Sequence, residues 1–212
     1  MSDWLLNDSV CMNVVWLSGL ASGRLAAMSL SIQRCDGDAD VRARKCLRRL
    51  QHPIRVFSDC DGISAILHCM RAVPGRPSFA LVGLSENCKS VHEVWDFNYG
   101  TWPEVRGCQK WVSMIGRDMA AVALSDLYVV GWPCVNLSTA NSTTRNADGN
   151  ETFESLMLSC LQYISEKKPR AFFIEQVANV GREFVKLLRD FEGALQAIGD
   201  AQGRAVYIVR SG

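Results

Sequence analysis

The chain has 212 residues, of which 48% are hydrophobic and 21% are charged, and its formal net charge is +1. This composition predicts a globular chain with a well-formed core, and it excludes a strongly basic surface that holds nucleic acid by charge alone. No apolar run reaches the roughly 18 residues of a membrane span, and the apolar residues 10–32 lack the basic flank of a signal peptide. The nine cysteines are scattered and odd in number, so we expect reduced thiols, no membrane partner and a nuclear or cytoplasmic location.

The N-terminal part, residues 1–52, carries no recognisable motif, and we treat it as an extension whose structure the sequence does not decide. Within it, residues 42–49 form a basic run. Such a run is typical of a solvated helix face, although it could also contact phosphates or act as a nuclear address. We expect residues 53–212 to form the folded domain.

The first strand is predicted at residues 54–57, after His52-Pro53. A short loop ending at Gly62 and a helical pattern from Ile63 to Leu67 follow it. A strand, a tight glycine-containing loop and a helix form the plan of a nucleotide-type cofactor site, where backbone amides approach the ligand. An ordinary strand–helix turn is the alternative.

The second strand is predicted at residues 79–84, and Glu86 follows its end. Nucleoside sites place an acidic residue there, about 20 residues after the loop, to accept hydrogen bonds from ribose hydroxyls. We therefore predict Glu86 as a ribose ligand, with a helix N-terminal carboxylate as the alternative. The helix is expected to run from Cys88 to Phe97.

A third strand is predicted at residues 110–115, followed by Asp118 and an Ala-rich helical stretch from Met119 to Leu124. Asp118 is placed to serve as a helix N-cap.

Two further buried-strand patterns, at residues 127–131 and 171–177, carry the strongest chemical signal. Cys134 lies just beyond the first of them, and Glu175 lies at the end of the second. Because ligands bind at the carboxyl ends of the strands in open α/β sheets, the thiol and the carboxylate are expected to face one cleft.

The connecting segments complete the predicted α/β architecture. Residues 138–150 are polar and aperiodic, which is typical either of a functional loop or of a plain surface loop. Amphipathic helices are predicted at residues 153–164 and 180–198, and a final strand at residues 204–209.

These blocks resemble the cytosine-C5 DNA methyltransferases over roughly residues 53–209. The matching residues are Asp126-Leu127, Gly131-Trp132-Pro133-Cys134, Ser138 and the run from Lys168 to Val177. In that family a Pro-Cys pair carries the nucleophile and a Glu-Asn-Val triplet carries the carboxylate that holds the target base. The resemblance therefore implies catalytic roles for Cys134 and Glu175 at a family-like separation.

The resemblance also implies a Rossmann-like fold that binds S-adenosylmethionine, with a mostly parallel sheet flanked by helices and truncated at the C-terminus. Phe57, Gly62, Glu86 and Asp118 match its cofactor-binding positions. The loop after Cys134 would close over the substrate, with Ser138 and Arg145 as substrate contacts. The implied partner is DNA whose target cytosine is flipped out of the duplex, and RNA is not excluded. No metal is needed.

Several residues depart from the family pattern. Asp59 and Asp61 stand where the cofactor loop has glycines, and we expect their carboxylates to lie near the carboxylate of the cofactor. Arg55 replaces an acidic residue, Val135 replaces the Gln after the nucleophile, and Gln176 replaces the Asn of the triplet. The family's C-terminal motifs cannot be placed. The alternative to an active methyltransferase is thus an inactive Rossmann-like fragment that acts as a binding or regulatory module.

Overall fold

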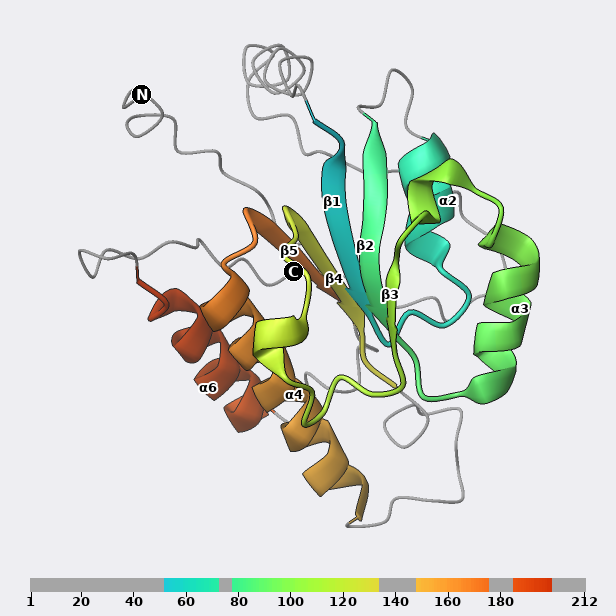
Figure 1. Ribbon diagram of the computed structural model, residues 1–212. Coiled ribbons are helices and arrows are strands. Elements are labelled where there is room, and N and C mark those ends of the chain that lie inside the picture. The colour runs from blue at the N-terminus through green and yellow to red at the C-terminus, as the bar shows by residue number, and fades with distance from the viewer. Residues whose placement is uncertain (1–51, 73–77, 134–147, 176–184, 200–212) are drawn as a thin grey trace, which may run out of the picture.

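The computed structural model describes residues 52–72, 78–133, 148–175 and 185–199. The extension, Cys134, Ser138, Arg145 and the predicted strand at residues 204–209 lie outside these ranges. Within them the protein forms a five-stranded sheet with helices on both faces (Figure 1). The α/β architecture predicted from the sequence is confirmed.

The pairings between the described strands are all parallel, and the strand order is β3-β2-β1-β4-β5. The strands are β1 (Ile54–Asp59), β2 (Phe79–Ser85), β3 (Gln109–Trp111), β4 (Leu127–Gly131) and β5 (Ala171–Glu175). The chain runs outward from β1 to β3 and then returns to β4, so the strand order reverses between β1 and β4. This reversal is a topological switch point, where doubly wound sheets open a crevice for a ligand.

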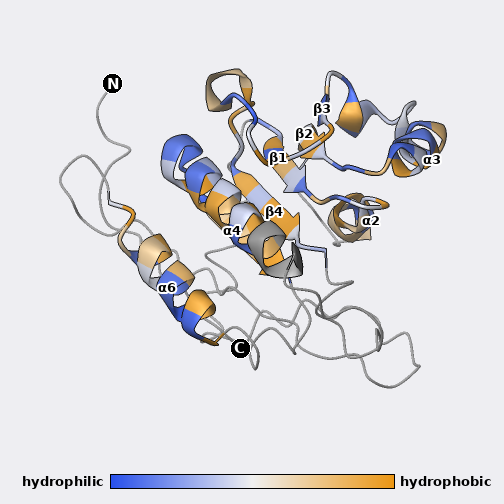
Figure 2. Ribbon diagram, turned by 90° about the horizontal axis from the view of Figure 1, so that it is seen from below, coloured by the Kyte–Doolittle hydropathy of each residue, from blue (hydrophilic) through white to orange (hydrophobic). Residues whose placement is uncertain are grey.

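Four helices of the described ranges cover the two faces of the sheet. They are α2 (Ala65–Ala72), α3 (Lys89–Tyr99), α4 (Asp148–Lys167) and α6 (Val185–Gln196). Figure 2 shows α2 and α3 on one face, and α4 and α6 on the other. Two short 3-10 helices, η1 (Pro103–Val105) and η2 (Met119–Ala121), lie in the connections around β3. None of the helices in the described ranges is long and apolar enough to span a membrane.

The helix predicted over residues 119–124 is wrong beyond its first turn. Only η2 forms there, because the Gln109 side chain binds the backbone that a longer helix would need. Its Nε2 donates to the Ala121 carbonyl (3.2 Å), and its Oε1 accepts from the Ala123 amide (2.9 Å). The strand β3 is correspondingly short, Gln109–Trp111, instead of the predicted residues 110–115.

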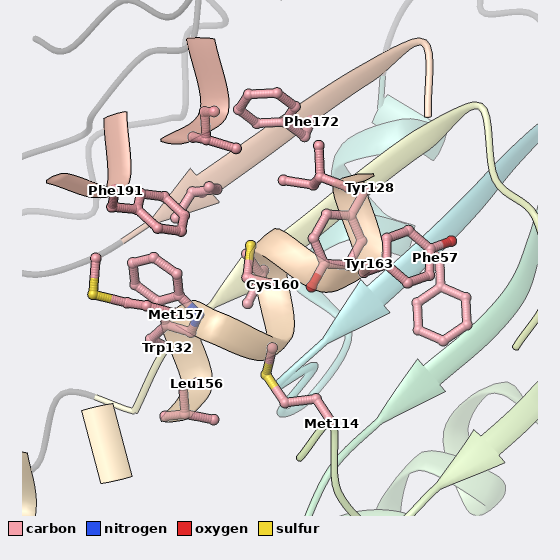
Figure 3. Packing of buried hydrophobic residues seen from close by; sticks show 14 of the residues in the cluster. Phe57, Met114, Tyr128, Trp132, Leu156, Met157, Cys160, Tyr163, Phe172 and Phe191 are labelled. Carbon is pink, nitrogen blue, oxygen red and sulfur yellow. The ribbon is translucent and has the colours of Figure 1, made fainter. Parts of the chain in front are cut away.

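The larger core lies between the sheet and the α4–α6 layer (Figure 3). The apolar positions predicted on one face of α4 lie in or against this core: Phe153, Leu156, Met157, Cys160, Leu161 and Ile164. The ring of Tyr163 stacks on that of Tyr128 from β4, with 4.3 Å between their centroids. Large rings fill this face, so α4 packs closely against the sheet.

Candidate functional site

The carboxyl ends of the strands meet at one edge of the sheet. Asp59 pairs with Ser85 in register, and Ser85 pairs with Trp111. On the other side Gly131 pairs with Glu175. Among the predicted site residues, Glu175 lies at a strand end and Gly62 and Glu86 follow strand ends, so the parallel topology gathers these three along a single edge, as expected for a ligand-binding sheet.

The loop from β1 to α2 has a strained backbone. Cys60, Gly62 and Ser64 have φ values of 51°, 55° and 56°, in the left-handed region that favours glycine. A Cβ placed on Gly62 would meet nothing within 4 Å, so the space beside this residue is open. The Gly62 amide donates to Glu86 Oε2 at 3.0 Å. The loop is therefore tied to the end of β2 by a predicted site residue.

Glu86 links the loop to the start of α3. Its Oε1 accepts from the Cys88 amide (2.9 Å), and its own amide donates to the Trp111 carbonyl (3.0 Å). The side chain is partly exposed, and a carboxylate offers about four acceptor sites, of which two are used here. Glu86 thus accepts a bond at the N-terminus of α3, which is the predicted alternative to a ribose ligand. Its carboxylate keeps acceptor capacity for two further hydroxyl donors. Sequence reasoning did not foresee its bond to Gly62.

Asp118 is exposed and caps η2, accepting from the Ala120 amide at 2.9 Å through Oδ1. The structure therefore shows the N-cap role for Asp118.

Phe57 lies in the core and is 0% exposed. Its ring packs beside Tyr163, with 5.0 Å between the centroids, and leaves no room for a side chain at Gly83. The structure therefore places this predicted cofactor residue in the core, two residues before the end of β1.

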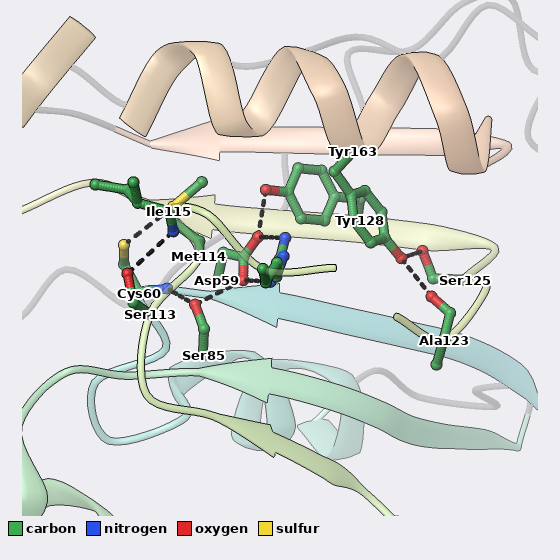
Figure 4. A network of polar contacts seen from close by, with 11 residues as sticks. Asp59, Cys60, Ser85, Ser113, Met114, Ile115, Ala123, Ser125, Tyr128 and Tyr163 are labelled. Atoms are coloured by element: carbon green, nitrogen blue, oxygen red, sulfur yellow. Dashed lines mark hydrogen bonds and ion pairs between the residues drawn. The ribbon is translucent and has the colours of Figure 1, made fainter. Parts of the chain in front are cut away.

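The expectation that Asp59 faces the cofactor is wrong. Its carboxylate is fully buried and forms a two-pronged ion pair with Arg117, with distances of 2.6 Å to Nη1 and 2.5 Å to Nη2. The hydroxyls of Ser85 and Tyr128 each donate to it at 2.6 Å (Figure 4). The pKa of Arg117 is raised, because the bonds and the charge of Asp59 outweigh the effect of burial. Nothing in the sequence pattern marks Arg117, apart from its place beside Asp118.

Asp61 also turns away from the open edge. Its Oδ2 accepts from the Ser64 hydroxyl, while Oδ1 is buried without a hydrogen-bond partner. Burial raises the pKa of Asp61 to about 6, and the nearby charge of Glu86 acts in the same direction. A buried acceptor without a partner is costly for a charged carboxylate, in line with the raised pKa of Asp61.

Glu175 lies against the backbone that leads to Cys134. A Cβ built on Gly131 would be 3.6 Å from Glu175 Oε2, so the carboxylate group packs over the end of β4. Burial raises the pKa of Glu175. Trp132, which follows Gly131, is anchored in the core between Phe153 and Phe191. The segment toward Cys134 therefore leaves the sheet directly beside Glu175.

A search of solved structures found matches of low identity. Three of them are precorrin-6y C5,15-methyltransferase from Geobacter metallireducens GS-15, a putative RNA methyltransferase, PH1948, from Pyrococcus horikoshii, and the methyltransferase EhMeth from Entamoeba histolytica. Identities are 10%, 13% and 12%, and TM-scores are 0.39, 0.40 and 0.42. The alignments cover 74%, 75% and 68% of this chain, and 72%, 69% and 44% of those chains. A comparison with curated proteins found no match.

A family model carries the assignment. The model of C-5 cytosine-specific DNA methylases matches residues 54–199, which is more than half of the chain and nearly the span of the resemblance seen in the motifs. The chain therefore belongs to the C-5 cytosine-specific DNA methylase family, and its enzyme class is the methyltransferase that the sequence predicted.

Proposed function

We propose that this protein transfers a methyl group from S-adenosylmethionine to C5 of a cytosine in DNA, through a covalent adduct of Cys134. One observation carries the proposal. Glu175 packs over Gly131 at the end of β4, and Cys134 is only three residues further along the chain. This adjacency suits a site in which one residue attacks a base that the other holds.

The residues of the carboxyl edge fit S-adenosylmethionine. Glu86 has two free acceptor sites for the ribose hydroxyls, Gly62 has open space beside it, and the exposed Asp118 can accept from the adenine amino group. These three residues would hold the nucleoside part of the cofactor. When bound, the cofactor supplies an electrophilic methyl group.

Cys134 would act as the nucleophile. Its thiolate adds to C6 of cytosine and forms a sulfur–carbon bond, which shifts electron density to C5, a position otherwise too weak to accept a methyl group. After methylation, loss of the C5 proton and expulsion of the Cys134 thiolate restore the aromatic ring. Because C6 is inaccessible within a duplex, the base must be flipped out.

Glu175 would bind the edge of the base that carries N3 and the exocyclic amino group. Burial raises the pKa of Glu175, and in its protonated form the carboxyl would donate to N3 while the second oxygen accepts from the amino group. Donation to N3 stabilises the negative charge that develops on the ring as the thiolate adds.

The second candidate is an inactive Rossmann-like module that binds a partner or nucleic acid. It is favoured by Asp59, a position where the family has glycine, because the carboxylate and its Arg117 partner fill space at the switch point. The two candidates differ in whether Cys134 forms a bond with a base.

A trapping experiment separates them. In a DNA duplex containing 5-fluorocytosine, fluorine replaces the proton at C5 and cannot be eliminated. A working enzyme therefore remains covalently attached to the base once the methyl group has been transferred. We expect a denaturation-resistant adduct with the wild type and with Cys88→Ser, an exposed-cysteine control. Cys134→Ser should give none, and Glu175→Gln should form it roughly 100-fold more slowly. Absence of an adduct with the wild type, or its persistence in Cys134→Ser, contradicts the mechanism.

A further inference from the structure

Asp59 occupies the centre of a buried polar network at the switch point of the sheet. All four acceptor sites of its carboxylate are filled, by two nitrogens of Arg117 and by the hydroxyls of Ser85 and Tyr128. The side chains of Asp59 and Arg117 are 0% and 1% exposed. A carboxylate whose acceptor sites are all filled cannot accept a further bond from a ligand, so we look for the role of Asp59 in the residues that it joins.

The network joins the two loops that carry the candidate cofactor ligands. Arg117 directly precedes Asp118, and Ser85 directly precedes Glu86. Arg117 and Ser85 bind the same Asp59 carboxylate. Asp118 and Glu86 are therefore each adjacent in the chain to a residue that Asp59 holds in place. Ser85 Oγ also accepts from the Cys60 amide at 3.4 Å, which ties in the loop after β1.

The Arg117 guanidinium is also held sterically. It lies over the rings of Phe57 and Tyr163, with 4.9 Å and 5.4 Å to the ring centroids. A planar guanidinium that is stacked and bonded at two nitrogens has one orientation, whereas a single-point cation has several.

Stability alone does not account for such a pair. Removing two charges from water costs several kcal/mol per ion in real proteins, so apolar residues of similar size are often as stabilising as a buried ion pair. In addition, the two parallel hydrogen bonds fix the orientation of Arg117 relative to Asp59. We propose that Arg117 and Asp59 are positioning residues, whose two-pronged bond sets the relative placement of Glu86 and Asp118 for the nucleoside of the cofactor. This role rests on the proposed function.

The test replaces the fork of Arg117 by a single-point cation. Arg117→Lys keeps the charge and loses the two-pronged geometry. The matched control is Arg71→Lys, because Arg71 makes the same type of bond to Glu104, at 3.2 Å and 2.8 Å, in the last turn of α2. Arg71 also lies over the ring of Trp102, 3.5 Å from its centroid, so the control matches the ring stacking of Arg117 as well.

The readouts are amide exchange by NMR in the ligand-free protein and S-adenosylmethionine affinity by calorimetry. The informative amides are those of Ala120 and Cys88, which donate to Asp118 and Glu86. In Arg117→Lys we expect exchange at these amides to accelerate at least about threefold and Kd to rise about tenfold. A tenfold change in Kd corresponds to about 1.4 kcal/mol. Arg71→Lys should change neither quantity.

A milder variant covers the case in which Arg117→Lys does not fold. Ser85→Ala removes one donor to Asp59 and leaves the ion pair intact, so we expect faster exchange at Cys88 with little change at Ala120. Unchanged exchange in both variants, or an unchanged Kd despite faster exchange, overturns the positioning role. A wild type that binds no S-adenosylmethionine, while its loops still loosen in Arg117→Lys, supports the network's effect on the loops and refutes the proposed function instead.

Discussion

The contact between Gly83 and Phe57 gives the sharpest prediction of stability. In the register of β1 and β2, an irregularity between Val56 and Phe57 brings Phe57 opposite Gly83. A Cβ on Gly83 would lie 2.3 Å, 2.7 Å and 3.0 Å from three atoms of the Phe57 ring. Because an ordinary contact begins near 3.4 Å, Gly83→Ala requires the ring to move by roughly 1 Å.

The ring has little room for this movement. It is 0% exposed and lies among Tyr128, Tyr163 and Arg117. Inserting a methyl group into a filled core costs about 1–3 kcal/mol, and we expect the upper end here because no flexible side chain can yield. For a chain of this size, about 3 kcal/mol lowers Tm by roughly 6–12 °C.

Gly193 in α6 is the matched control. A Cβ there meets nothing within 4 Å, so Gly193→Ala should raise stability by about 0.5–1 kcal/mol through helix propensity and chain entropy. Urea and thermal unfolding of both variants measure the difference. The Gly83→Ala penalty should also shrink in a Phe57→Leu background, since contacting residues couple. A Gly83→Ala protein within about 0.5 kcal/mol of the wild type would refute the packing argument.

Three further outcomes are expected. Tyr128→Phe removes a donor to a charged carboxylate and should lower the free energy of unfolding by about 1.5–3 kcal/mol. Tyr163→Phe should cost less, because the Tyr163 hydroxyl donates to neutral acceptors. Equal losses in urea unfolding would argue against the charged network. Because the pKa of Asp61 is raised to about 6, its protonated form stabilises the fold below its unfolded pKa of 3.8, and this contribution is lost as pH rises through about 6. Asp61→Asn should therefore gain stability over the wild type between pH 4 and 7, whereas a constant difference across that range would contradict the assignment. Glu86→Gln should raise the Kd for S-adenosylmethionine about tenfold while changing unfolding by less than about 1 kcal/mol, measured by calorimetry and urea titration; an unchanged Kd would remove Glu86 from the binding site.

The sequence alone determined the elements that have a local signature. The strands at β1, β2, β4 and β5 follow from short apolar runs, and α4 follows from the helical spacing of its apolar residues. The family follows from two blocks of residues around Cys134 and Glu175, a result that the family match over residues 54–199 confirms. These features depend on neighbours in the chain, so one sequence is enough to find them.

Only the tertiary structure decided which of the edge residues touch one another. Asp59 and Arg117 are 58 positions apart, and Gly62 and Glu86 are 24 apart, so no local pattern links the members of either pair. Their contacts arise because parallel pairing brings the ends of distant strands to one edge, and because the left-handed backbone of the β1–α2 loop turns Asp61 inward. In the sequence, Asp59 is a departure from the family's cofactor loop. In the fold, its carboxylate is fully hydrogen-bonded and connects two loops, because a buried charge is stable only when it is paired.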